Sequence, residues 1–249
     1  MTVPEGDTVW RAAHRLHQTL AGHVLTSCDF RVPQLATTDL AGFTVSEVVS
    51  RGKHMLTRLV RGEETLSLHT HFLMDGSWHI YPRGEKWRGG PAHTVRVVLK
   101  TASHDVVGYA MPVIDVIRTQ DEGKAVGHLG TDIMADEWSL DSAVASISAE
   151  PTAQIGDVLL DQRLIAGIGN LYRCEVLFIH RVTPWTLVAD VDVEAIITTA
   201  VRLMHRNRWE PRQITTGDDR RGHEHFVHAR GNRPCRRCST AIVVNASGV

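Results

Sequence analysis

The feature that most restricts the fold of this chain is a change of pattern along it, from short β-rich stretches to helical ones. From Val24 to about Ala110, runs of β-branched and apolar residues alternate with turn residues such as Gly52, Gly62 and Asp75-Gly76. Short runs at this spacing predict an antiparallel sandwich or barrel. The predicted strands are Val45 to Ser50, His54 to Val60, Thr65 to Phe72, Ser77 to Tyr81 and Thr94 to Lys100.

Helical periodicity lies on both sides of this β-rich region. Apolar residues from Val9 to Leu20 recur at helical spacing, with Asp7 as the predicted N-cap and Gly22 as the stop. Pro151 suits the first turn of a later helix, where a missing N–H is harmless. The later predicted elements are four helices and a terminal β-hairpin: Trp138 to Ile147, Pro151 to Ile165, Asn170 to Ile179, Val193 to Arg206 and, for the hairpin, Phe226 to Val249.

These patterns together predict an α+β protein: an N-terminal β domain, sandwich or barrel, with a leading helix over residues 1–134, a helical domain over 135–220 and a hairpin over 221–249. Hydrophobic residues make up 43% of the 249 and charged residues 22%, as in soluble globular proteins. No apolar run approaches the ~20 residues of a membrane span. The first ten residues carry Glu5 and Asp7 but no cation, which argues against a signal peptide. We therefore expect a cytoplasmic protein without membrane contact.

The formal net charge of −1 conceals a basic segment near the C-terminus. From Arg202 to Arg237 the chain carries ten arginines and four acidic residues. A solvated basic face and a phosphate-binding face are both consistent with this count. Arginine in place of lysine favours the second interpretation, because the planar guanidinium binds phosphate through two hydrogen bonds.

The pair Pro4-Glu5 is a candidate catalytic unit. An N-terminal amine has a pKa of about 8, against ~10.4 for lysine, so a useful fraction is unprotonated near neutral pH. Such an amine can attack the C1′ carbon of a deoxyribose and form a Schiff base, while an adjacent carboxyl group moves protons. The alternative is that Pro4 and Glu5 only mark the start of a helix.

Two residues of predicted turns are candidate contacts to a nucleotide. Lys53 follows Gly52 between two β-rich stretches, where its ammonium group could reach a phosphate or a leaving base; an ordinary turn lysine is the alternative. Met74 precedes the Asp75-Gly76 turn, where a flexible apolar side chain could fill the gap left by a flipped-out base. Core packing is the alternative for Met74.

The segment Gly167-Ile168-Gly169-Asn170 separates two predicted helices. Its glycines would let the backbone approach a phosphate, and the N-terminus of the following helix offers N–H groups and a favourable dipole. Asn170 is placed to cap that helix and to donate to the same phosphate. A tight turn with a structural cap is the alternative.

Cys235 and Cys238 form a Cys-x-x-Cys typical of zinc sites. A tetrahedral structural site needs four ligands, and His223, His225 and His228 are candidates for the others. The low cysteine content argues against a disulfide framework.

Read together, these motifs resemble the formamidopyrimidine-DNA glycosylase and endonuclease VIII family, and most closely its endonuclease VIII-like branch. The order and spacing of the motifs make the resemblance specific. It rests on Pro4 to Thr8, Arg51 to His54, Met74 to Trp78, His128 to Gly130, Leu159 to Tyr172 and Arg230 to Cys238.

The resemblance implies an N-terminal β-sandwich domain with flanking helices, a helix-two-turn-helix domain, a zinc-finger hairpin and damaged DNA bound between the domains, and we expect a monomer. It implies excision of oxidised bases, with pyrimidines favoured because the chain has Pro-Glu-Gly, followed by β- or β,δ-elimination. The roles it implies are Pro4 as Schiff-base nucleophile, Glu5 as proton donor, Lys53 as the cation at the damaged nucleotide, Met74 as a wedge, Gly169, Asn170 and Arg230 as DNA contacts, and Cys235 and Cys238 as zinc ligands.

The chain departs from the family pattern at both ends. Family members begin Met-Pro, whereas Thr2 and Val3 stand before Pro4 here; we expect Val3 to mark the true start, as a GUG codon. The family's second Cys pair is absent, so the finger is expected to be truncated or to use unusual ligands. The alternative function is a non-catalytic DNA damage-binding paralogue with a blocked Pro4.

Overall fold

The computed structural model describes residues 4–244. These residues form two compact units, one from Thr8–His128 and one from Leu129 onward together with the residues up to Asp7. The N-terminal segment thus belongs to the same unit as the C-terminal half of the chain. The three-part division at residues 134 and 220 stays a prediction.

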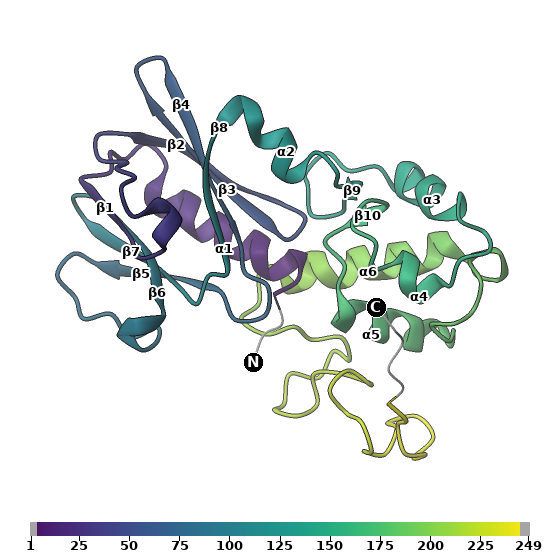
Figure 1. Cartoon of the computed structure of the whole chain (residues 1–249). Helices are drawn as coiled ribbons and strands as arrows, with labels where there is room; N and C mark the ends of the chain where they lie inside the picture. The colour runs from purple at the N-terminus through teal and green to yellow at the C-terminus, as the bar shows by residue number, and fades with distance from the viewer. Residues whose placement is uncertain (1–3, 245–249) are drawn as a thin grey trace. The chain divides into compact units, whose positions relative to one another are not determined.

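The unit Thr8–His128 contains two four-stranded antiparallel sheets (Figure 1). One has the order β1-β6-β7-β5 and the other β2-β3-β4-β8. Helix α1 (Gly6–Leu20) and the short α2 (Glu122–Val126) accompany them. The strands are β1 (Ser27–Phe30), β2 (Thr44–Arg51), β3 (His54–Arg61), β4 (Glu64–His71), β5 (Ser77–Pro82), β6 (Val95–Lys100), β7 (His104–Tyr109) and β8 (Val113–Arg118).

One hydrophobic core joins α1 to both sheets. Leu16 and Leu20 of α1 are buried with Leu59 of β3, Leu68 of β4 and Leu99 of β6. This burial is the main force that holds the sandwich together, because each such side chain contributes about 1.5–3 kcal/mol on leaving water.

The second unit is mainly helical. It contains α3 (Leu140–Ser148), α4 (Ile155–Val158), α5 (Asn170–His180) and α6 (Val193–Asn207), with a short parallel pair of β9 (Thr131–Asp132) and β10 (Ile165–Ala166). Helix α6 contacts both α3 and α5. Ser139 caps α3 and Asp192 caps α6 through their side chains. No helix within residues 4–244 is long and apolar enough to cross a membrane.

The five predicted strands and three of the later helices are confirmed, one later helix is much shorter than predicted, and the terminal hairpin forms in part. Of the helix predicted for Pro151 to Ile165, only the single turn α4 (Ile155–Val158) forms. The helix does not start at Pro151, because the N–H groups of Ile155 and Gly156 donate to the carbonyls of Thr186 and Pro184. The predicted hairpin after Phe226 forms in part within the described residues. Pro234 and Ala241 make an antiparallel bridge, which backbone hydrogen bonds flank from the N–H of Cys235 to the carbonyl of Thr240 and from the N–H of Asn232 to the carbonyl of Ile242, both at 2.8 Å. Strands β1, β7 and β8 lie in stretches for which no strand was predicted.

Candidate active site

The Glu5 carboxylate lies at the N-terminus of helix α5. Its Oε2 accepts hydrogen bonds from the N–H of Gly169 at 2.9 Å and of Tyr172 at 3.4 Å, and its Oε1 accepts one from the N–H of Leu171 at 2.6 Å. The first N–H groups of a helix have no partner within it, and the helix dipole favours a negative charge there. Glu5, which is only 1% exposed, therefore caps a helix that begins far along the chain.

Three glycines make this close approach possible. The N–H of Gly6 donates to the carbonyl of Gly167 at 2.9 Å, and a Cβ on Gly6 would lie 2.9 Å from the Cα of Gly167. Gly167 has a φ of +109°, which favours glycine. A Cβ on Gly169 would lie 2.6 Å from the Cδ of Glu5. These glycines thus hold the N-terminal segment against the start of α5.

Pro4 precedes Glu5 directly and is partly exposed. The structure therefore brings together Pro4, Glu5, Gly169 and Asn170 of the predicted site in one unit. Met1, Thr2 and Val3 lie outside the described residues, so the predicted start at Val3 stays a prediction.

The predicted capping roles of Asp7 and Asn170 are wrong. Asp7 is the second residue of α1, and its side chain accepts hydrogen bonds from Tyr172 and Gln213 instead of capping that helix. Asn170 is the first residue of α5, whose N-cap is Gly169. The Asn170 Oδ1 accepts from Arg173 at 2.6 Å, and the residue is exposed.

Lys53 lies in the other unit, in the two-residue turn between β2 and β3. The turn is tight because Arg51 pairs with His54 and Gly52 adopts a φ of +57°. Burial, with the neighbouring histidines and the Lys53 charge, lowers the pKa of His54 to about 3. Burial, with the charges of Lys53 and His69, lowers the pKa of His71 to about 4. These two imidazoles are therefore neutral near pH 7, which leaves Lys53 as the cation among the three.

Met74 lies in the turn that follows β4 in the same unit as Lys53. Its side chain is 66% exposed, and its neighbour Leu73 is 51% exposed with a φ of +46°. Met74 is therefore not packed in the core, which excludes the alternative interpretation of this residue.

Arg230 is engaged within the C-terminal segment. It donates to the carbonyl of Phe226 and, at 2.8 Å, to that of Pro234. Burial and the charges of Arg236 and Arg233 lower its pKa. Its predicted contact with DNA stays a prediction.

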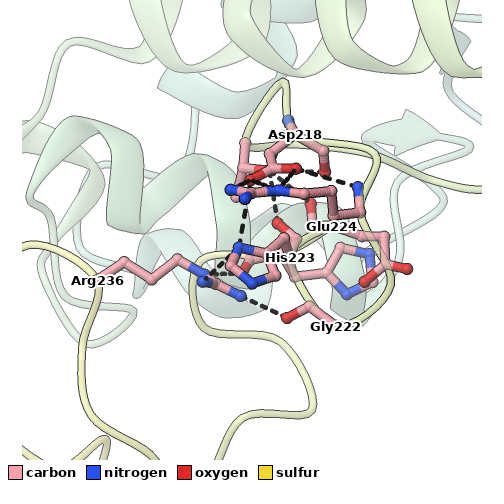
Figure 2. A network of polar contacts seen from close by, with 8 residues as sticks. Asp218, Gly222, His223, Glu224 and Arg236 are labelled. Carbon is pink, nitrogen blue, oxygen red and sulfur yellow. Dashed lines mark hydrogen bonds and ion pairs between the residues drawn. The ribbon is translucent and has the colours of Figure 1, made fainter.

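The three candidate histidines do not join Cys235 and Cys238. His223 lies 3.2 Å from Asp218 and contacts Arg236, which also donates to the carbonyl of Gly222 (Figure 2). Within residues 4–244, no group of three or more His, Cys, Asp or Glu side chains is placed to hold a metal ion. Two thiols supply half of a tetrahedral site, so the described residues do not by themselves fit structural zinc.

One buried acidic residue of this unit was missed by the sequence reasoning. Glu175 of α5 is fully buried and accepts hydrogen bonds at 2.7 Å from three successive N–H groups, those of Phe226, Val227 and His228. It fixes the start of the segment that carries Arg230. The sequence indicates this burial only weakly, through the position of Glu175 among apolar residues of a predicted helix.

The fold matches that of DNA glycosylases. Two family models cover most of the chain: the formamidopyrimidine-DNA glycosylase N-terminal domain over residues 3–112 and the formamidopyrimidine-DNA glycosylase H2TH domain over residues 129–207. Among solved structures, the complex between Lactococcus lactis Fpg and DNA containing an abasic site has a TM-score of 0.79 at 18% identity, covering 98% of this chain and 96% of that one. This likeness shows the fold.

Similarity to named relatives is higher. The probable endonuclease 8 2 of Streptomyces coelicolor is 48% identical over 249 residues, which cover 99% of this chain and 88% of the relative. The DNA-(apurinic or apyrimidinic site) lyase Nei2 of Mycolicibacterium smegmatis is 36% identical, covering 99% of this chain and 94% of the relative. The chain belongs to the formamidopyrimidine-DNA glycosylase and endonuclease 8 family.

Proposed function

We propose that this protein is a DNA glycosylase and AP lyase that removes oxidised bases, with a preference for pyrimidines, and then cleaves the strand. The observation that carries the proposal is the buried Glu5 carboxylate, held by three N–H groups directly beside Pro4. Relatives named endonuclease 8 and DNA-(apurinic or apyrimidinic site) lyase support it. No observation favours the non-catalytic alternative.

The proposed chemistry begins at the Pro4 nitrogen, which must be a free secondary amine. Glu5 takes the proton from the Pro4 ammonium group. The nitrogen then bonds to C1′ of the damaged nucleotide, and the bond from C1′ to the base breaks with its electron pair leaving on the base. The remaining N–H proton of Pro4 passes to the departed base. The sugar ring opens as its oxygen accepts the proton from Glu5, and the freed lone pair on the nitrogen completes the C=N bond of an iminium ion.

Strand cleavage follows from the iminium ion. Loss of a proton from C2′ and departure of the 3′ phosphate complete β-elimination, and a second elimination can release the 5′ phosphate.

We propose that Lys53 provides positive charge at the damaged nucleotide, since the neighbouring His54 and His71 are neutral. Met74 would fill the gap in the duplex, and Gly169, Asn170 and Arg230 would contact phosphates. Zinc binding, the monomeric state and the cytoplasmic location stay predictions.

Borohydride trapping tests the proposal. A duplex with one oxidised pyrimidine is incubated with a chain that begins at Pro4, and sodium borohydride is added. We expect a covalent protein–DNA adduct and, without borohydride, a cleaved strand. Binding to the duplex without either product would support the non-catalytic alternative and overturn the proposal.

Gly169→Ala should lower base excision about a hundred-fold. The new Cβ would overlap the Glu5 carboxyl group, and a displacement of ~1 Å at a reacting group can cost about 10²-fold in rate. Single-turnover excision measures the effect. Gly217→Ala is the matched control: this loop glycine has open space for a Cβ, so only the strain of its φ of +81° is added. Equal rates for Gly169→Ala and Gly217→Ala would contradict the prediction.

Asn170→Ala should weaken DNA binding to damaged and undamaged duplexes by the same factor, about five- to ten-fold. Asn170 is exposed at the N-terminus of α5, where a lost phosphate contact affects all sequences alike. Titration of both duplexes at one fixed salt concentration provides the comparison. A loss confined to the damaged duplex would argue against a phosphate contact.

A further inference from the structure

A second buried carboxylate lies two residues from Glu5. Asp7 is 0% exposed, and its two oxygens accept hydrogen bonds from different side chains. The hydroxyl of Tyr172 donates to Oδ2 at 2.7 Å, and Nε2 of Gln213 donates to Oδ1 at 2.9 Å. Because a buried charge is costly without partners, these contacts are needed to hold the carboxylate where it lies.

Tyr172 connects both carboxylates of the N-terminal segment. Its backbone N–H donates to Glu5, and its hydroxyl donates to Asp7. The same hydroxyl accepts a hydrogen bond from Asn207 at 2.8 Å, which fixes the direction of its proton. Burial and the Asp7 charge raise the pKa of the Tyr172 phenol well above its ordinary value, so it stays a donor throughout the working pH range.

Gln213 and Asn207 anchor the other side of this cluster. Asn207, at the end of α6, bonds both the N–H and the carbonyl of Ile214. Gln213 is 4% exposed, and its own carbonyl contacts the ring of His225. Asp7 is therefore bound to two separate parts of the unit, helix α5 and the segment after α6.

From this geometry we propose that Asp7 is a positioning residue, which holds Pro4 and Glu5 in register with the start of α5. The inference rests on the proposed function and assigns Asp7 no contact with the substrate. Glu5 and the N–H of Gly6 both bond the segment to the start of α5, so these two contacts leave it free to pivot about that point. A second bonded carboxylate two residues on removes that freedom, which matters because catalytic groups must be held within about 0.5 Å of their productive geometry.

Three variants test the proposal. Asp7→Ala removes both hydrogen bonds. Asp7→Asn can keep both hydrogen bonds. The Asn oxygen accepts from the Tyr172 hydroxyl, and the Asn NH₂ group donates to the side-chain oxygen of Gln213 once the Gln213 amide has rotated by 180°. Thr199→Val is the matched control: it removes the 2.8 Å hydrogen bond to His180 between α5 and α6 and has no link to residues 4–7.

We expect Asp7→Ala to slow borohydride trapping on a preformed abasic duplex ten- to a hundred-fold. The DNA affinity of Asp7→Ala should equal that of the parent. The trapping rate of Asp7→Asn should stay within about three-fold of the parent rate. Thr199→Val should trap at the parent rate, although we expect it to lose about as much thermal stability as Asp7→Ala. A normal trapping rate for Asp7→Ala would overturn the proposal, as would equal losses in Asp7→Ala and Thr199→Val. If Asp7→Ala does not fold, Gln213→Leu removes one of the two bonds at similar volume and takes its place.

Hydrogen exchange separates this inference from the proposed function. The Gly6 N–H is bonded to Gly167, so its exchange reports whether the segment is held. Asp7→Ala should speed that exchange at least ten-fold, while Thr199→Val should not. If the parent protein forms no adduct, the proposed function fails, and unchanged Gly6 exchange in Asp7→Ala still overturns the positioning role.

Discussion

Glu5→Gln is expected to lower the rate of base excision by about 10²–10⁴-fold, the usual contribution of a positioned proton-transfer group. A glutamine amide can neither take the proton from Pro4 nor pass it to the ring oxygen. Its NH₂ group would also meet N–H donors of Gly169, Leu171 or Tyr172, all of which now donate to Glu5. Single-turnover excision from a duplex with one oxidised pyrimidine measures the effect.

The same variant should retain more activity on a preformed abasic site, because no base has to leave there. Glu194→Gln serves as the control, since Glu194 is an exposed acid in the first turn of α6. Normal base excision by Glu5→Gln would show that the proton-transfer role is wrong.

The second large effect concerns the Pro4 nitrogen. A chain that begins at Pro4 should form the borohydride adduct, whereas a chain that keeps Met1, Thr2 and Val3 should form none above background. In the longer chain this nitrogen belongs to a peptide bond, whose resonance removes its nucleophilic lone pair. Mass spectrometry of the trapped and digested adduct should place the sugar on Pro4.

Pro4→Gly offers a graded control in the shorter chain. Its primary amine should retain part of the AP lyase activity, because a free N-terminal amine remains. Intact mass of the protein from its natural source reports which residue comes first. An adduct on Lys53, or equal trapping by both chains, would exclude Pro4 as the nucleophile.

Features set by neighbouring residues could be predicted from the sequence. Strands β2 and β3 follow from their β-branched residues and from Gly52, whose φ of +57° lets Arg51 pair with His54. Helices α5 and α6 follow from apolar periodicity, and the choice of Pro4 and Glu5 as candidate site residues follows from the chemistry of an amine beside an acid.

Features set by distant parts of the chain could not be predicted. A helical pattern favours Pro151 to Ile165, yet the carbonyls of Pro184 and Thr186 take its N–H groups and only α4 forms. Asp7 has the side chain of a good N-cap, but Tyr172 and Gln213 engage it. The N-terminus of α5 is capped by Glu5, which no local pattern at Asn170 could indicate.

The capping of α5 by Glu5 has a consequence for the newborn polypeptide. A ribosome makes the proposed nucleophile and its acid well before their binding surface, which runs from Gly167 to Tyr172. An unfinished chain therefore has both reactive groups and no scaffold to aim them. The proposed competence to cut DNA is in this way postponed until the start of α5 has been made.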